Sequence, residues 1–102
     1  MTKRDRLNAD DIAEGLADLT GWSLSADGSA IEKTYHFPSF VEAFGFMSQS
    51  ALAAEKLDHH PEWFNVYNRV DVTLTTHTAR GVTALDLALA ARMEAAASHA
   101  RA

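Results

Sequence analysis

The first apolar residues of the chain recur at the spacing of a helix. Ile12, Leu16 and Leu19 are separated by four and three positions, so they share one helical face. Asn8 or Asp10 can begin this helix, because a short polar side chain accepts a free backbone N–H of the first turn. We therefore expect an amino-terminal helix that packs through this face.

After Gly21, which suits a helix end, the pattern changes to a period of two. Residues 22–25 alternate apolar and polar side chains, and residues 30–37 form a second strand-like run that Lys33 interrupts. The Asp27-Gly28 pair between the two runs is typical of a tight hairpin turn, in which both central positions require a positive φ. These features predict an antiparallel hairpin.

A second, longer helix is predicted from Ser39 onward. The sequence Ser39-Phe40-Val41-Glu42 has the form of a capping box, in which the serine hydroxyl accepts the N–H of the glutamate. Apolar residues then recur at alternating spacings of four and three, which is typical of a wide face turned toward the core. They are Phe40, Phe44, Met47, Ala51 and Ala54.

A second pair of strands follows this helix. Residues 63–66 are typical of a third strand, and Tyr67-Asn68 is a plausible turn. Residues 70–75 alternate cleanly between apolar and polar side chains, which predicts a half-buried fourth strand.

The chain is then interrupted at Gly81 before a last helix. The sequence Thr83-Ala84-Leu85-Asp86 can cap this helix in the same way as Ser39 caps the earlier one. Its apolar face is formed by Leu85, Leu89 and Met93. The Ala-rich tail, residues 95–102, has little to bury, so we expect it to fray.

The predicted order is therefore α-β-β-α-β-β-α. Two hairpins separated by a helix indicate one four-stranded antiparallel sheet with the helices on one face, which is an α+β two-layer domain. At 102 residues the chain is expected to form a single domain, residues 1–102. The other face or an open edge of the sheet would then be covered by self-association.

Composition narrows the classes of function. The chain has no cysteine, which excludes disulfides and thiolate metal sites. Its net charge is −5 and its basic residues are scattered, so direct binding to nucleic acid is not expected. The apolar runs are too short to span a membrane and no signal-type segment follows the basic amino terminus, so we expect a cytoplasmic protein.

The stretch Asp58-His59-His60-Pro61-Glu62-Trp63 carries the most chemistry. It supplies two imidazoles, two carboxylates, a rigid proline and an indole, and His77 follows at the end of the fourth predicted strand. Three interpretations are open: histidines with a surface or capping role, a metal site, and an acid–base centre. Histidine suits acid–base chemistry because its ordinary pKa lies near neutrality.

The spacing argues against the metal site. Adjacent residues of an extended chain point in opposite directions, so His59 and His60 are poorly placed to bind one ion. No His-x3-His pair of the helical type is present either. We therefore expect proton transfer without a metal, acting on a planar ligand. Trp63 or Trp22 could stack on this ligand or simply pack in the core.

Several motifs together are more specific than the histidines alone. They are Glu55-Lys56-Leu57-Asp58-His59-His60-Pro61-Glu62-Trp63, Tyr67-Asn68, Thr76-His77, Gly81-Val82-Thr83 and Asp86. In this order and spacing they resemble the pterin-4a-carbinolamine dehydratase family, over nearly the whole chain. The small departures are Thr75, where related sequences often carry Ser, and Val82, where Leu is common; both are chemically conservative.

This resemblance implies a lyase that dehydrates 4a-hydroxytetrahydropterin to quinonoid dihydropterin by histidine acid–base catalysis. The pterin is the substrate, and no metal or second cofactor is required. The resemblance also implies a role in tetrahydrobiopterin recycling, linked to an aromatic amino acid hydroxylase, and assembly as a homodimer or homotetramer.

The resemblance further implies roles for particular residues. His59 and His77 would transfer protons at the 4a oxygen, and His60 would bind and orient the pterin and could share the acid role. The other implied pocket residues are Asp58, Pro61, Trp63, Thr75, Thr76 and Thr78. Asp86 has two interpretations, a carboxylate that sets a histidine tautomer and a plain cap of the last helix.

A second functional hypothesis belongs to a different class. The family resembled also includes interaction proteins, namely a dimerisation cofactor of a homeodomain transcription factor in animals and an assembly factor for a carbon-fixing enzyme in bacteria. Assembly-type relatives would be expected to lose the His-His-Pro centre. Its presence in this chain favours catalysis, although it does not exclude a second, non-enzymatic role.

Overall fold

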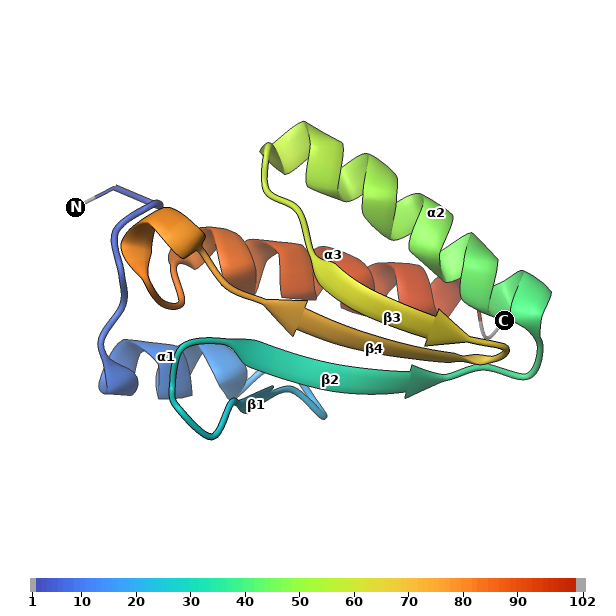
Figure 1. The fold of residues 1–102 in the computed structure, drawn as a ribbon, viewed down its shortest axis with the longest axis horizontal. Helices are drawn as coiled ribbons and strands as arrows, with labels where there is room; N and C mark the ends of the chain where they lie inside the picture. The colour runs from blue at the N-terminus through green and yellow to red at the C-terminus, as the bar shows by residue number, and fades with distance from the viewer. Residues whose placement is uncertain (1, 101–102) are drawn as a thin grey trace.

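The computed structural model describes residues 2–100, and its elements follow the predicted order (Figure 1). They are α1 Ala9–Leu16, β1 Ser23–Leu24, β2 Ile31–His36, α2 Phe40–Leu57, β3 Glu62–Val66, β4 Arg69–Leu74, the 3₁₀ turn η1 His77–Ala79 and α3 Ala84–Ala100. Within the described residues, no helix is long and apolar enough to cross a membrane.

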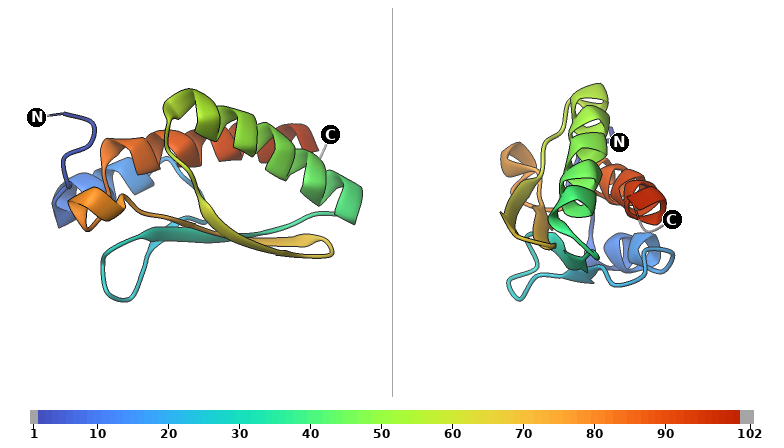
Figure 2. Two further views of the ribbon diagram at one scale, coloured as in Figure 1. Left: turned by 45° about the horizontal axis from the view of Figure 1, so that its top comes forward. Right: turned by 90° about the vertical axis from the view of Figure 1, so that its right-hand side faces the viewer.

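The strands form one antiparallel sheet in the order β1-β2-β4-β3. The two hairpins are joined by the pairing of β2 with β4, which runs from Ile31 opposite Leu74 to His36 opposite Arg69. Figure 2 shows the three helices on one side of this sheet, with the other side uncovered. The predicted α+β fold with a four-stranded antiparallel sheet is therefore confirmed.

The core lies between the sheet and the helices. The apolar residues predicted to alternate along β4 are buried, and they are Val70, Val72 and Leu74. The predicted apolar face of α3 is also buried, and it consists of Leu85, Leu89 and Met93. A period of two residues in the strand and of 3.6 residues in the helix therefore predicts the face that packs in the core.

The apolar face predicted for α2 is correct only in part: Ala54 is buried and Met47 packs against the core, but the other three residues are exposed. Phe40 and Phe44 are 47% and 57% exposed, and Ala51 is exposed as well. The buried residues of α2 are Ala43, Phe46, Ser50 and Ala54. Three of these four are small, which allows α2 to pack closely along α3, and the larger aromatic stripe is turned outward. Ser39 does cap the helix, its hydroxyl accepting the Glu42 N–H at 3.3 Å.

The first hairpin is confirmed, but its turn is wider than predicted. Only Gly28 of the Asp27-Gly28 pair has a positive φ, 78°. The Asp27 carboxylate instead accepts hydrogen bonds from Ser29 and Ser25, which lower the pKa of Asp27 to about 2. The predicted strand 22–25 shortens to Ser23–Leu24, because Trp22 turns into the core.

The carboxyl-terminal helix extends further than predicted. Residues 95–102 were expected to have little to bury, but α3 continues to Ala100, and Ala96 and Ala97 are each 5% exposed. That expectation is therefore wrong for these residues, while residues 101–102 lie outside the described part of the chain.

Lys33, which interrupts the apolar face of β2, has its ammonium paired with Glu94 of α3 at 2.8 Å. The same Glu94 oxygen accepts hydrogen bonds from Tyr35 Oη and, at 3.3 Å, from Trp22 Nε1. Partial burial raises the pKa of Glu94, but the bonds from Lys33, Tyr35 and Trp22 together with the charge of Lys33 outweigh it and lower that pKa overall. This cluster ties the second half of α3 to the sheet.

Candidate active site

The histidine motif begins where α2 ends. Asp58 adopts the left-handed conformation (φ 51°), and its N–H bonds the carbonyl of Glu55 at 3.2 Å. The N–H of His59 bonds the carbonyl of Ala54 at 3.1 Å. These two bonds form a Schellman motif, which ends the helix and fixes the direction in which the chain leaves it. The chain then descends from α2 to β3, as Figure 1 shows.

His59 is the buried histidine of the motif. Only 8% of its side chain is exposed, and its Nε2 lies 2.5 Å from Oδ1 of Asp86, which is fully buried. An ionised carboxylate only accepts hydrogen bonds, so with Asp86 ionised the proton of this contact is the one on Nε2 of His59. Nδ1 of His59 has no hydrogen-bond partner among the described residues.

Asp86 is held in turn by two threonines. Its Oδ2 accepts the hydroxyl of Thr76 at 2.9 Å and the backbone N–H of Thr83 at 2.8 Å. The hydroxyls of Thr76 and Thr83 lie 2.8 Å apart. Because Thr76 donates its single hydroxyl proton to Asp86, Thr83 is the donor in this second hydrogen bond. Asp86 therefore fits both interpretations from the sequence: it contacts a histidine and it caps α3.

His77 belongs to an exposed pair. Its Nε2 lies 2.7 Å from Oε2 of Glu62, with side-chain exposures of 80% and 54%. Both residues line a cavity of about 410 Å³ at the end of β4. The cavity is lined by Ser29, Ala30, Glu62, Thr73, Thr75, His77 and Arg80.

His60 forms a third, separate pair. Its Nε2 lies 2.7 Å from Oε1 of Glu55, and both side chains are exposed. His59 and His60 thus contact different carboxylates, in keeping with the opposite directions expected of neighbouring residues. Asp58 is exposed and lies 3.7 Å from Arg4 of the amino-terminal segment.

The remaining sequence-predicted residues surround these pairs. Trp63 is half-buried and packs against the core, and Pro61, two positions earlier, is half-buried as well. Thr75 lines the His77 cavity and donates its hydroxyl to the carbonyl of Ser29 at 2.6 Å. Thr78 is exposed in η1.

Sequence reasoning did not single out some residues that the structure brings to the histidines. Glu55 and Thr83 were read only as parts of a motif or a cap, and Ser29 and Arg80 were not considered. Glu55 and His60 are five positions apart across a helix end, which matches no periodicity. The Thr83-x-x-Asp86 capping pattern is the local sequence feature that indicates the buried hydrogen bonds around Asp86.

No group of three or more His, Asp or Glu side chains suited to hold a metal ion occurs in the part of the chain that the structure describes. His59, His60 and His77 are each paired with one carboxylate, so the described arrangement is one of proton donors and acceptors. The expectation of catalysis without metal or cofactor stays a prediction.

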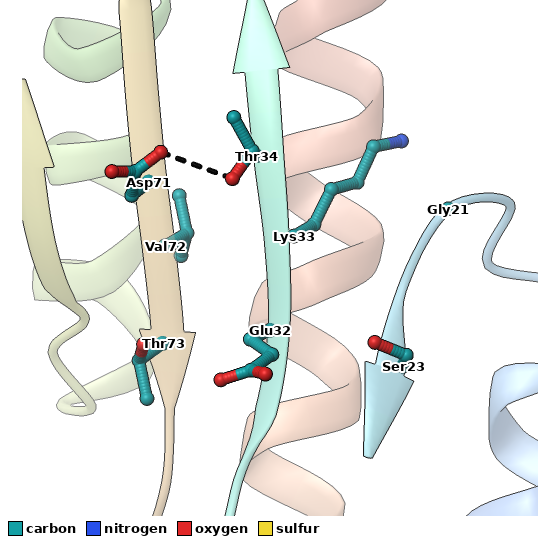
Figure 3. A pocket seen from close by; sticks show the side chains of 8 residues that line it. All are labelled: Gly21, Ser23, Glu32, Lys33, Thr34, Asp71, Val72 and Thr73. Carbon is teal, nitrogen blue, oxygen red and sulfur yellow. Dashed lines mark hydrogen bonds between the residues drawn. The ribbon is translucent and has the colours of Figure 1, made fainter. Parts of the chain in front are cut away.

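Another hollow lies on the uncovered face of the sheet, and Figure 3 shows it from close by. It measures about 400 Å³ and is lined by Gly21, Ser23, Glu32, Lys33, Thr34, Asp71, Val72 and Thr73. Thr34 donates to Asp71 across it at 3.0 Å. None of the candidate site residues lines this hollow, so we place the site at the histidine pairs instead.

Comparison with known proteins identifies the family. The sequence profile described as pterin 4 alpha carbinolamine dehydratase matches residues 5–96. A protein of Rhizobium johnstonii is 60% identical over 96 residues, covering 94% of this chain and 95% of its own length. One of Sinorhizobium fredii is 60% identical over 94 residues, covering 92% and 90%. Both carry provisional names as pterin-4-alpha-carbinolamine dehydratases.

Solved structures agree with this assignment. A crystal structure described as a transcriptional coactivator/pterin dehydratase from Brucella melitensis superimposes with a TM-score of 0.89 at 54% identity, covering 91% of this chain and 99% of its own. A pterin dehydratase-like protein described as a RuBisCO assembly factor in the alpha-carboxysome shares the fold, with a TM-score of 0.65, 24% identity and coverage of 76% and 89%. The chain described here belongs to the pterin 4 alpha carbinolamine dehydratase family.

Proposed function

We propose that this protein is a hydro-lyase that converts 4a-hydroxytetrahydropterins into quinonoid dihydropterins. The observation that carries the proposal is the buried pair of His59 and Asp86 at the start of the histidine motif. A fully buried carboxylate that fixes the proton on one imidazole nitrogen leaves the other nitrogen poised for proton transfer. Such fixed pairs are typical of acid–base sites.

The reaction needs two proton movements and no change of oxidation state. The bond between C4a and the hydroxyl oxygen breaks, and the oxygen takes up a proton and leaves as water. The proton on N5 is lost, and its electron pair forms the double bond between N5 and C4a. Because the nitrogen lone pair already pushes the hydroxyl out, modest acid–base assistance of about 10²–10⁴-fold is sufficient.

Three histidines divide this work in the proposal. His59 and His77 transfer protons at the 4a oxygen, and His60 binds and orients the ring. Each lies within 2.7 Å of a carboxylate, so each has a partner for its protonated form. No metal or organic cofactor takes part, and the pterin is consumed as the substrate. This chemistry would serve to recycle a tetrahydropterin oxidised by an aromatic amino acid hydroxylase.

The protein is also proposed to act as a homo-oligomer, at least a dimer. The outward stripe of α2 includes Phe40, Phe44 and Leu52, the last 73% exposed, and the open edge strand β3 adds Phe64 and Val66. Apolar surface of this kind beside an unpaired strand edge is suited to a second copy of the chain. Light scattering at micromolar concentration tests this, and a monomer would contradict it.

The central experiment is a dehydration assay with freshly generated 4a-hydroxytetrahydropterin, followed by absorbance against the spontaneous rate. His59→Ala and His77→Ala should each slow turnover moderately, because either histidine partly replaces the other. The double variant should nearly abolish acceleration, since residues that substitute for one another are not additive. His36→Ala, an exposed histidine of β2 away from the motif, is the matched control and should keep full activity.

The outcome separates two functions. A folded double variant with the wild-type rate would show that the acid–base assignment is wrong. Wild-type protein that does not exceed the spontaneous rate would instead favour a binding role. A relative at 54% identity is described as both a coactivator and a dehydratase, which keeps that second function in view.

A further inference from the structure

Arg80 lies beside the proposed site, and its side chain has no partner among residues 2–100, which the structure describes. It follows η1 in the left-handed conformation, with φ 58° and ψ 37°, and its backbone N–H bonds the carbonyl of His77 at 3.1 Å. This bond closes the turn, so both residues lie on the same turn and both line the cavity of about 410 Å³. That volume lies in the range of small-molecule sites.

The guanidinium of Arg80 forms no hydrogen bond or ion pair with any of residues 2–100 that the structure describes. The one carboxylate that lines the same cavity, Glu62, is engaged by His77 at 2.7 Å. Arg4 pairs with Asp58 and Arg69 with Asp71, whereas Arg80, like Arg92 on α3, has no carboxylate partner among the described residues. In a chain of net charge −5, this cavity is thus lined by a cation that no carboxylate of the described residues pairs.

We propose that Arg80 binds an anionic group on the C6 substituent of the pterin and so makes the site prefer charged substrates. This inference rests on the proposed function. In a pterin, C6 is bonded to N5, and N5 is bonded to the reacting C4a. If His77 serves the 4a oxygen, a substituent on C6 projects close to the turn that carries Arg80.

The chemistry of the group follows from the side chain. A guanidinium offers five N–H donors in a planar fork, which matches the paired oxygens of a phosphate or a carboxylate. An uncharged hydroxyalkyl group offers no such complement. The proposed substrate class is therefore 4a-hydroxytetrahydropterins with a phosphate or carboxylate at the end of the C6 substituent.

The test compares pterins that differ only in this substituent: an uncharged hydroxyalkyl chain, its phosphate ester and a carboxylate analogue. The quantity measured is the ratio of kcat/KM for the charged compound to that for the uncharged one. Arg80→Gln should lower this ratio about tenfold or more, the effect of one hydrogen bond to a charged group. Arg80→Lys should restore part of it, and added salt should lower it in the wild type.

Arg92→Gln is the matched control, because Arg92 is an exposed arginine of α3 that lies outside this cavity; its ratio should stay at the wild-type value. Comparing the phosphate with the carboxylate shows which anion is preferred. An equal ratio in wild type and Arg80→Gln, with both proteins folded by circular dichroism, would overturn the inference.

Binding of the oxidised, unreactive pterins is measured in parallel by fluorescence titration, so that the two proposals can fail separately. Anion preference that is lost in Arg80→Gln, without any dehydration by the wild type, would sink the proposed function and support the subsite. Dehydration with no anion preference in either assay would sink the subsite alone.

Discussion

His59 and His77 are both paired with carboxylates, but the two pairs are built in opposite ways. The side chain of His59 is 8% exposed and its partner Asp86 is fully buried, whereas His77 and Glu62 are 80% and 54% exposed. Asp86 has two further donors, Thr76 and Thr83, while Glu62 has none among the described residues. The pair of His59 and Asp86 is thus part of the protein interior, whereas the pair of His77 and Glu62 lies on the surface.

This difference separates fixed from adjustable parts of the proposed site. Exposed ion pairs contribute little to stability, about 0–1 kcal/mol, so a ligand can displace Glu62 from His77 at small cost. The buried pair cannot open without leaving unsatisfied donors in the protein interior, which costs about 1–3 kcal/mol for each one. We infer that His59 provides a preset proton position and that His77 adapts to the ligand.

The largest effect is expected from removing the buried carboxylate. Asp86→Ala leaves His59 Nε2, the Thr76 hydroxyl and the Thr83 N–H without their acceptor, so unfolding free energy should fall by about 3 kcal/mol or more. Glu62→Ala, which removes the exposed partner of His77, should change it by about 0.5 kcal/mol or less. Urea unfolding measures the unfolding free energy of both variants. Equal decreases would contradict the difference between the buried and the exposed pair.

Glu94 is an intermediate case, with 30% of its side chain exposed. Glu94→Gln removes a carboxylate that binds Lys33, Tyr35 and Trp22, and should lower stability at neutral pH by roughly 1.5 kcal/mol. Because the pKa of Glu94 is lowered on folding, its contribution is complete above its unfolded pKa of about 4.3 and is lost as the pH falls through the lower folded pKa. The gap between wild type and variant in melting experiments should therefore narrow toward acid; a constant gap from pH 7 to pH 3 would contradict this.

A smaller effect is expected at His60, which is exposed and paired with exposed Glu55. His60→Ala should leave stability within about 0.5 kcal/mol of the wild type. If His60 orients the pterin, loss of one hydrogen bond of about 1 kcal/mol should raise KM about fivefold, at least as much as it lowers kcat. Steady-state kinetics would contradict this role if kcat fell while KM stayed constant.

No effect is expected from metal removal. Proton transfer by histidines paired with carboxylates does not require an ion, so dehydratase activity should survive exhaustive chelation. Metal analysis of the purified protein accompanies the assay. Stoichiometric zinc or iron, with activity lost when it is removed, would replace the proposed mechanism.

Much of the fold could be predicted from local patterns. The element order, both hairpins and the faces of β4 and α3 follow from single periodicities that no competing pattern disturbs. On α2 two apolar stripes compete, and hydrophobicity alone favours the larger one, Phe40 and Phe44. The stripe that packs is set by how closely α3 approaches, which favours small residues such as Ala43 and Ser50 and is not visible in the sequence.

The sequence predicts where in the chain the candidate site lies, but not which side chains contact one another there. His59, His60 and Asp58 are contiguous, so the motif itself was visible. Which carboxylate each histidine contacts depends on the turn at the end of α2 and on the docking of α3. Asp86 is 27 positions from His59, and Glu62 is 15 positions from His77. These contacts arise from tertiary packing, and the spacing of residues along the chain does not predict them.

Because of the Schellman motif at the end of α2, the direction of the His59 side chain depends on the length of this helix. Since N–H bonds of Asp58 and His59 lock them to the last turn, the imidazole of His59 rotates with the helix. α2 has 18 residues, and each residue turns the helix by about 100° and lengthens it by about 1.5 Å. Adding or deleting one residue anywhere along α2 would turn His59 away from Asp86. A change in the length of the loop between β1 and β2 would not rotate any of these side chains. The length of α2 should therefore be far less free to vary than that of the loop.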